Sequence, residues 1–395
     1  MSKLDELIKK LCPNGVEHKK ITDIAETFIG LVTTMTKHYC DEGIKLLHNS
    51  DIKENKIVLK SVIYLDREFA KKNESRIHKI GDIITVHTGD IGTSAVIEKE
   101  FEGSLGFATI VTRLKKDNPY YVSYFLNSNE CKKQIYQKVK GDRNNLNLKD
   151  FNEIIVPVPP REVQCEIVRI LDNFTELTAE LTAELTARRK QYEYYKYKLL
   201  FENIKEVEKA PLEKIAEYSK KRTLCSVLNK DTFVGVDNLL QNKFGKRDSE
   251  CVPTVGNCTG YSKGDILIGN IRPYLKKIWY ATNDGGTSGD VLVVTLKTGK
   301  VLSKFLYYVL SSDEFFEYDD SHSKGAKMPR GDKTSIMKFY IPIIAIEEQR
   351  RIVDILDKFD TYCNDLTQGL PAEIELRKQQ YEYYRDKLLS FKELK

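Results

Sequence analysis

The longest regular pattern in the chain is a stripe of apolar residues between positions 164 and 200. These side chains recur at steps of three, four or seven, the spacing of an amphipathic α-helix with a coiled-coil seam. They are Ile167, Ile170, Leu171, Phe174, Leu177, Leu181, Leu185, Tyr192, Tyr195 and Leu199. No proline interrupts residues 164–200, so the segment predicts one helix of roughly 55 Å at 1.5 Å per residue. A helix of that length would act as a spacer between domains.

A second copy of this pattern lies at the C-terminal end of the chain. Residues 188–200 read RRKQYEYYKYKLL and residues 377–389 read RKQQYEYYRDKLL. A match of that length and unusual composition is not chance, so the chain contains an internal repeat of about half its length. The second apolar stripe comprises Ile352, Ile355, Phe359, Leu366, Leu370, Ile374, Tyr381, Tyr384 and Leu388. Gly369 and Pro371 are expected to bend or break the second helix.

The repeat extends upstream of both helices. Gln164, Ile167, Ile170, Leu171, Asp172 and Phe174 pair with Gln349, Ile352, Ile355, Leu356, Asp357 and Phe359. Further back, VPVP at residues 156–159 pairs with IPII at residues 341–344, and GDII at residues 81–84 pairs with GDIL at residues 264–267. Each half of the chain therefore consists of a globular region followed by a shared helix.

The globular regions contain short runs typical of β-strands at residues 82–87, 109–113, 265–268 and 290–295, separated by turns with glycine. Helical stretches near residues 120–137 and 301–317 complete each region, which predicts α+β domains. A duplicated chain tends to pack with approximate two-fold symmetry, so we expect two long antiparallel coiled-coil helices with one globular head at each end. The expected domains are 1–159, 160–207, 208–344 and 345–395, in the order head, helix, head, helix.

This order resembles the specificity subunit of Type I restriction-modification enzymes over essentially the whole chain. The matching landmarks of the first half are Gly81-Asp82, the loop GDRNNL at 141–146, the turn PVPP at 157–160 and Gln164; those of the second half are Gly264-Asp265, the loop from Gly325 to Asp332 and Gln349. The second half has Pro342 followed by Ile-Ile-Ala where the first has two further prolines, which leaves the entry into the second helix open.

The resemblance implies a function and partners. Each globular region would be a target recognition domain that reads one half of a bipartite double-stranded DNA site. The helices would set the separation of the half-sites and dock two methyltransferase subunits, and restriction subunits would complete the complex. S-adenosylmethionine, ATP and Mg²⁺ would be used by those other subunits, and this chain would hold no cofactor. The alternative is a coiled-coil scaffold whose two heads bind protein.

Composition is compatible with this interpretation without demanding it. A chain of 395 residues exceeds the usual size of one hydrophobic core, and its net charge of +5 permits a nucleic-acid partner. The eight cysteines form no C-x-x-C pair, so we expect structural or free thiols and no metal site. The N-terminus lacks a signal-peptide pattern and no apolar run approaches ~20 residues, so a cytoplasmic protein is expected. The resemblance implies a bacterial or archaeal one.

Sequence motifs for catalysis are incomplete. Residues 117–121 read DNPYY, which is close to the Asn/Asp-Pro-Pro-aromatic motif of adenine methyltransferases but lacks the second proline. An N-cap turn before the helix near residue 120 is the preferred interpretation. The G-x-x-x-x-G-K-[ST] phosphate loop is absent. His87 and His322 lie near aspartates, but structural or DNA-contacting roles are preferred over catalysis. We expect no catalytic residues in this chain.

Candidate DNA contacts gather in polar loops. Arg143, Asn144 and Asn145 combine a guanine-reading side chain with two adenine-reading amides, although an ordinary polar turn would look the same. The corresponding candidates of the second half are Asn270, Arg272, Tyr274, Lys276, Lys277, Lys324, Lys327 and Arg330, with phosphate contact preferred for the lysines. His87 and a basic cluster of Lys71, Lys72, Arg76 and Lys79 are further candidates; the alternative for the cluster is a solvated surface.

The long helices carry two further features. Tyr192, Tyr194 and Tyr195, like Tyr381, Tyr383 and Tyr384, cover more than one helix face, which indicates contact with the other head or a partner helix, or packing within the chain. Candidate partner-binding or seam residues are Gln164, Ile167, Leu171, Phe174, Tyr192, Tyr195, Gln349, Ile352, Leu356, Phe359, Tyr381 and Tyr384. A tandem Thr-Ala-Glu-Leu repeat within residues 177–185 suggests a length adjuster, or a helix-forming filler.

Overall fold

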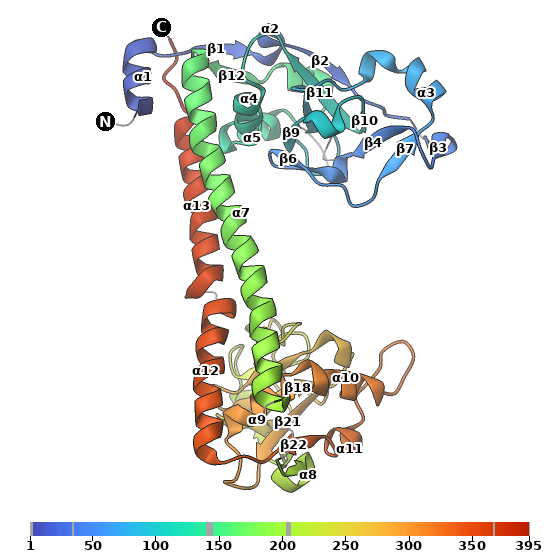
Figure 1. Cartoon of the computed structure of the whole chain (residues 1–395), viewed down its shortest axis with the longest axis vertical. Helices are drawn as coiled ribbons and strands as arrows, with labels where there is room; N and C mark the ends of the chain where they lie inside the picture. Colours follow the sequence, from blue (N-terminus) through green and yellow to red (C-terminus); the bar gives the residue numbers. More distant parts are fainter. Residues whose placement is uncertain (1–2, 34, 140–144, 203–206, 366–367, 395) are drawn as a thin grey trace. The chain divides into compact units, whose positions relative to one another are not determined.

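The computed structural model describes residues 3–33, 35–139, 145–202, 207–365 and 368–394 (Figure 1). The chain divides into two compact units. The first unit comprises Met1–Glu180 together with Glu375–Lys395, and the second comprises Leu181–Ile374. Each unit therefore contains one globular region and a part of each long helical segment.

The first unit is built on an antiparallel sheet in the order β2 (Ala25–Ile29), β11 (Thr109–Leu114), β8 (Ile83–Val86) and β9 (Ser94–Val96). The strand β8 is buried along its whole length. A second sheet has the order β10 (Leu105–Phe107), β4 (Ile44–His48), β7 (Ile63–Leu65) and β3 (Tyr39–Cys40). Two short pairs complete the strands: β1 (Glu17–Lys20) with β12 (Ile155–Val158), and β5 (Ile52–Lys53) with β6 (Lys56–Ile57).

Helices α4 (Pro119–Leu126) and α5 (Asn129–Lys138) occupy the stretch near residues 120–137 that was predicted to be helical. Asn118 is the N-cap of α4, and its side chain accepts a hydrogen bond from the Tyr120 backbone N–H at 3.0 Å. The N-cap interpretation of the DNPYY segment is therefore confirmed. The other helices of this globular region are α1 (Lys3–Leu11), α2 (Ile21–Ile24), α3 (Arg67–Lys72) and α6 (Leu148–Asn152).

The second unit repeats this architecture. Its main sheet has the order β14 (Ala216–Tyr218), β21 (Val291–Leu296), β18 (Ile266–Gly269) and β19 (Ile278–Tyr280), which matches the first sheet strand for strand. Its other strands are β15 (Arg222–Leu224), β17 (Asn257–Tyr261), β20 (Gly285–Thr287) and β16 (Phe233–Val234), and the pair β13 (Lys209–Pro211) and β22 (Tyr340–Pro342). Its helices are α8 (Leu212–Ile215), α9 (Ser303–Leu310), α10 (Asp313–Ser321) and α11 (Lys333–Ile336). The α+β class and the internal repeat are confirmed.

The long helices differ in continuity, as predicted. The first, α7 (Arg161–Tyr197), is unbroken and ends in a π-helical turn, Lys198–Glu202. The second is divided into α12 (Ile346–Asn364) and α13 (Gly369–Leu388). Gly369 has a φ of +77° and opens α13, where the first turn also tolerates Pro371. The predicted break is present, but α12 ends upstream of the two residues expected to cause it.

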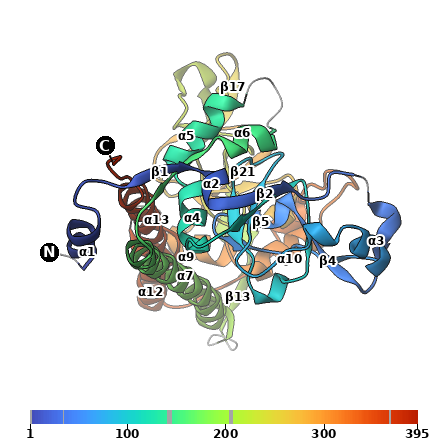
Figure 2. The same ribbon diagram turned by 90° about the horizontal axis from the view of Figure 1, so that it is seen from above.

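Within each unit the long helices pack side by side. In the second unit, Arg189 of α7 donates from Nε to the Cys363 carbonyl oxygen at 3.3 Å, and the rings of Tyr192 and Tyr195 lie 6.3 Å from that of Phe359. The contacts advance along α7 as they recede along α12, so the two helices are antiparallel. In the first unit, Phe174 of α7 stacks on Tyr384 of α13 at 5.5 Å. Figures 1 and 2 show α7 beside α13 from two directions.

Candidate nucleic-acid interface

The loop after the central strand of each main sheet is fixed to a second loop. In the first unit, the Leu146 N–H donates to the His87 carbonyl oxygen at 2.9 Å. In the second unit, the Gly331 N–H donates to the Asn270 carbonyl oxygen at 3.1 Å. Isolated bridges join Thr88 to Asn145 and Ile271 to Arg330 beside these bonds. The candidates of the second half, predicted in two separate loops, therefore lie together.

In the second unit the 270–277 loop has an unusual backbone. Arg272 and Lys276 adopt the left-handed conformation, with φ of +53° and +50°, on either side of a 3₁₀ turn, Pro273–Leu275. The Arg272 N–H donates to the Pro329 carbonyl oxygen at 2.7 Å, which joins the two loops. Arg272 is exposed, as is Tyr274 at 51%. These two side chains form the outward face of the loop.

The two lysines of this loop are engaged inside the unit. Lys277 is buried, and its Nζ donates to the Val236 carbonyl oxygen at 2.6 Å. Burial lowers the pKa of Lys277 below its usual value. Lys276 forms an ion pair with Asp313 at 2.7 Å. Asn270 is buried as well. These contacts hold the loop to the unit. Two of the predicted DNA-contacting side chains, Asn270 and Lys277, are buried, and Lys276 is partly buried in its ion pair.

The loop that precedes α11 keeps its basic side chains at the surface. Lys324 is 79% exposed and pairs with Asp332 at 3.0 Å, while Lys327 is exposed. Arg330 lies 3.2 Å from a carboxylate oxygen of Asp290. Hydrogen bonds from Ser335 and Lys324 lower the pKa of Asp332 to about 2. The backbone amides and carbonyls of Lys324 and Arg330 exchange two bonds of 2.9 Å, so the loop is a closed hairpin.

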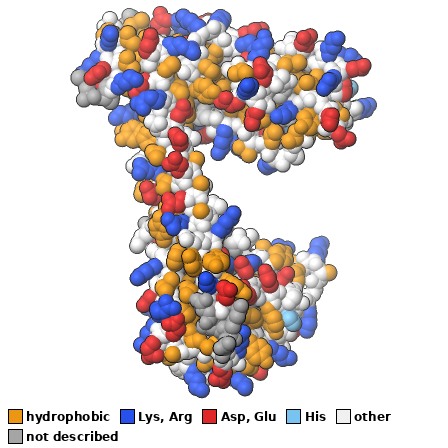
Figure 3. Space-filling view, viewed as in Figure 1, with side chains coloured by type: hydrophobic (Ala, Val, Ile, Leu, Met, Phe, Trp, Pro, Cys, Tyr) orange, Lys and Arg blue, Asp and Glu red, His pale blue; other side chains and the backbone are white. Residues whose placement is uncertain are grey.

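The candidates of the first unit are less concentrated. Lys71, Lys72 and Lys79 are exposed, whereas Arg76 donates from Nη1 to the Gly30 carbonyl oxygen at 3.2 Å. His87 is partly buried, which lowers the pKa of its imidazole, and its Nδ1 lies 2.8 Å from Thr88 Oγ1. Asn145 is exposed and accepts a hydrogen bond from Thr88. Arg143 and Asn144 lie outside the described residues. In Figure 3, basic and acidic side chains alternate over the visible face of each unit.

Gln164 and Gln349 form the same buried clamp in the two units. The Gln164 side chain accepts from the Asn118 N–H and donates to the Pro159 carbonyl oxygen, both at 2.8 Å. Gln349 accepts from the Leu302 N–H and donates to the Ile344 carbonyl oxygen, also at 2.8 Å. Each glutamine therefore fastens the start of a long helix to the N-terminus of α4 or α9. The two landmarks hold the helix to its own globular region.

The remaining seam candidates pack within their units. Ile167, Leu171, Ile352 and Leu356 are fully buried in the two main cores. Phe174, Tyr192, Tyr195, Phe359 and Tyr384 form the ring contacts between helices described above, and Tyr381 accepts a hydrogen bond from Asn55 at 3.4 Å. Tyr194 and Tyr383 remain more than half exposed. Packing within the chain accounts for one tyrosine face, and another stays available.

Sequence reasoning missed two buried cations. Lys196 of α7 is 3% exposed and donates from Nζ to the Ser311 carbonyl oxygen at 2.8 Å; burial lowers its pKa to about 8. Arg385 of α13 is 2% exposed and lies 3.6 Å from Glu54. The two residues occupy equivalent positions of the repeat, RRKQYEYYK and RKQQYEYYR. The sequence did contain a signal for these buried cations. Both copies of the repeat have a cation at this position, although the next residue changes from Tyr197 to Asp386.

Within the described part of the chain, no three His, Cys, Asp or Glu residues lie close enough to hold a metal ion. Among the same residues, no helix is both long and apolar enough to span a bilayer.

The comparison with known proteins decides the family. Residues 13–188 and residues 204–376 each match the family model of the Type I restriction modification DNA specificity domain, so the two matches cover well over half of the chain. The chain belongs to this family. The resemblance inferred from the repeat is confirmed, and the two matched segments correspond to its two copies.

Curated relatives and solved structures agree with this assignment. A type I restriction enzyme specificity subunit of Escherichia coli is 32% identical over 296 residues, 69% of this chain and 70% of that protein. A putative type I restriction enzyme specificity subunit of Haemophilus influenzae is 34% identical over 267 residues, 63% of this chain and 67% of its own length. A chain from a structural study of type I complex assembly matches with a TM-score of 0.67 at 15% identity, covering 96% of this chain and 98% of that one. The S subunit from M. genitalium matches with a TM-score of 0.53 at 15% identity, covering 94% and 96%. These two structures support the fold.

Proposed function

We propose that this specificity subunit reads a bipartite DNA target, one half-site with each unit. The duplication of the recognition unit carries the proposal: both units have the same main sheet, and in both the loop after the central strand is fixed to a second loop. The exposed Arg272, Lys324 and Lys327 supply side chains that bind phosphates or base edges. The curated relatives are named specificity subunits, in keeping with this role.

The chemistry of the complex is assigned to other subunits. Asn118, which stands where a methyltransferase motif would place its reactive-site residue, uses its side chain to cap α4. Two methyltransferase subunits would bind the duplicated helix ends, where Tyr194 and Tyr383 leave a tyrosine exposed in each unit. Restriction subunits would complete an assembly that uses S-adenosylmethionine, ATP and Mg²⁺ in the cytoplasm.

Selection from random double-stranded DNA tests this function. The purified chain, assembled with its methyltransferase subunits, should enrich a split motif with an unread spacer and methylate it. The chain without those subunits should bind DNA and transfer no methyl group. Enrichment of one continuous motif, or of none, would refute bipartite reading. Methylation by the chain alone at the rate of the complex would refute the division of labour.

A further inference from the structure

The two units differ at one backbone position of the loop after the central strand. His87 and Asn270 occupy equivalent places, because each accepts the backbone bond from the second loop. The residue two positions later is Gly89 in the first unit, with a φ of +98°, and Arg272 in the second, with a φ of +53°. Glycine adopts this region freely, whereas a residue with a Cβ is strained there. The second unit therefore has an arginine in a backbone conformation that glycine adopts more readily.

Nothing within the chain repays that strain through the Arg272 side chain. Among the described residues, the structure gives its guanidinium no hydrogen bond and no ion pair, and the side chain is exposed. The neighbouring Pro273 is buried and fixes the turn, while Tyr274 is exposed beside Arg272. The left-handed backbone supports the bond from the Arg272 N–H to the Pro329 carbonyl oxygen, but the side chain makes no hydrogen bond or ion pair of its own within the described part of the chain. A strained residue whose side chain is left exposed in this way is typical of a functional site. An arginine fork and a tyrosine are suited to contacts with DNA base edges and backbone.

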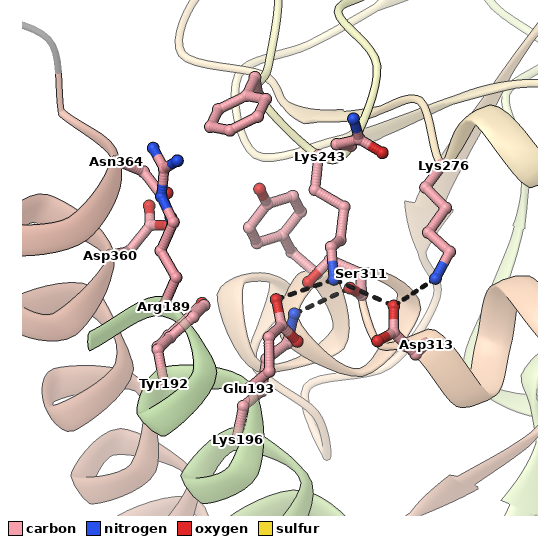
Figure 4. Close-up of a pocket in the computed structure, with 13 residues that line it drawn as sticks. Arg189, Tyr192, Glu193, Lys196, Lys243, Lys276, Ser311, Asp313, Asp360 and Asn364 are labelled. Atoms are coloured by element: carbon pink, nitrogen blue, oxygen red, sulfur yellow. Dashed lines mark hydrogen bonds and ion pairs between the residues drawn. The ribbon is translucent and has the colours of Figure 1, made fainter. Parts of the chain in front are cut away.

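Three connected ion pairs hold the 270–277 loop to the rest of the second unit (Figure 4). Lys276 lies 2.7 Å from a carboxylate oxygen of Asp313, at the N-terminus of α10. The same oxygen is 3.2 Å from Lys243, which also pairs with Glu193 of α7 at 2.8 Å. Lys243 is itself left-handed, with a φ of +67°, and its N–H donates to the Lys276 carbonyl oxygen. Asp313 therefore connects the loop to both α10 and α7 within the second unit.

The first unit lacks this link at the equivalent place. Asn129 follows the N-cap Ser128 of α5 as Asp313 follows the N-cap Ser312 of α10. The Asn129 amide donates to Asp386 of α13 at 2.6 Å, so it joins α5 to the long helix. Among the described residues, no side-chain hydrogen bond joins Asn129 to the loop after β8. The repeat thus offers a matched control, in which the helix is fastened but the loop is not.

We propose that the 270–277 loop determines the half-site read by the second unit, with Arg272 contacting a base and Asp313 acting as the positioning residue that holds the loop. This inference rests on the proposed function and deepens it. The left-handed backbone of Arg272 fixes the direction in which its side chain leaves the loop. The ion pairs of Asp313 with Lys276 and Lys243 hold the loop in this conformation when DNA is absent. A preformed loop loses less conformational freedom on binding, which improves discrimination between bases.

The test uses the full chain assembled with its methyltransferase subunits and a DNA library in which both half-sites are randomised. Arg272→Gly restores the residue type of the first unit and relieves strain, so the variant should fold at least as well as the parent. Its preference at one position of the second unit's half-site should fall by about 5- to 150-fold, the discrimination of one bidentate contact. Arg272→Lys should lose the same preference while keeping most of the affinity, because lysine retains the charge without the fork.

Asp313→Asn tests the positioning role separately. It should weaken discrimination across the second unit's half-site and leave the other half-site unchanged, whereas Asn129→Ala should leave the second unit's half-site unchanged. Unaltered base preferences in Arg272→Gly, in a complex that still methylates a split target, would overturn the inference and leave the proposed function intact. A parent complex that selects no split target would overturn the proposed function itself. Equal loss in both half-sites for Asp313→Asn would show a general structural role.

Discussion

Insertion of one Thr-Ala-Glu-Leu unit after Leu185 should lengthen the unread spacer of the target by one base pair. Four residues add roughly 6 Å to an α-helix and rotate its far end by about 40°, at 1.5 Å and about 100° per residue. One base pair of B-DNA advances about 3.4 Å and turns about 34 to 36°. The rotation therefore matches one base pair, and the translation lies between one and two.

The structure favours tolerance of this insertion. The helix α7 is continuous from Arg161 to Tyr197, and the boundary between the two units falls after Glu180, inside the repeat. Leu177 is 47% exposed, and none of the three leucines of the repeat belongs to a buried core. The inserted unit preserves the leucine spacing of four residues, so neither recognition loop should change.

Sequencing of methylated sites for the parent and the insertion variant provides the assay. Both half-sites should be unchanged and the spacer one base pair longer; deletion of one unit should shorten it by the same amount, provided that the helix pair still closes. An active insertion variant with the parental spacer would refute the hypothesis that the repeat adjusts the spacer length. It would support the alternative, that the repeat is only a helix-forming filler. Altered bases in either half-site would show that the insertion disturbs the recognition loops.

Three further predictions concern stability, measured by urea unfolding. Gln164→Leu and Gln349→Leu should each lower the unfolding free energy by about 2 to 4 kcal/mol, because each leaves buried backbone groups without partners; a loss in only one would contradict equivalent clamps. Burial lowers the pKa of Lys196 in the folded chain to about 8 from 10.5, so this lysine should make the unfolding free energy rise between pH 8 and 10.5. Lys196→Met should remove the part of the rise that comes from this lysine. Burial raises the pKa of Asp319 to about 7 from 3.8, so its contribution to the unfolding free energy falls as the pH rises from 3.8 to 7. Asp319→Asn should therefore stabilise the chain at pH 8 and have little effect at pH 4. Equal effects at both pH values would contradict this.

The regular parts of the fold follow from local patterns. The apolar stripe predicts α7, and the runs at residues 82–87 and 265–268 coincide with β8 and β18. Such elements are predictable because their hydrogen bonds and apolar faces repeat at fixed spacing. The end of α12 at Asn364 was harder to predict, because it lies before Gly369, whose φ of +77° falls outside the right-handed helical region.

The candidate site shows where sequence reasoning stops. Lys276 and Lys277 look alike in the sequence, yet one pairs with Asp313 and the other donates to the Val236 carbonyl oxygen. These partners are tens of residues away, so their proximity depends on how the loops pack. The left-handed conformation of Arg272 was equally hidden, because glycine is the residue that normally signals it.

The division of the chain into units has a consequence for inheritance. The first unit is assembled from Met1–Glu180 and from the last residues, Glu375–Lys395, and Leu389 belongs to its core. A premature stop codon just before residue 375 would therefore damage the first unit, although its globular region is encoded well upstream. Recombination that replaces the codons for residues 181–374 preserves the first unit only if the codons for residues 375–394 still match residues 1–180. The two specificities are thus linked genetically in a way that their order along the gene conceals.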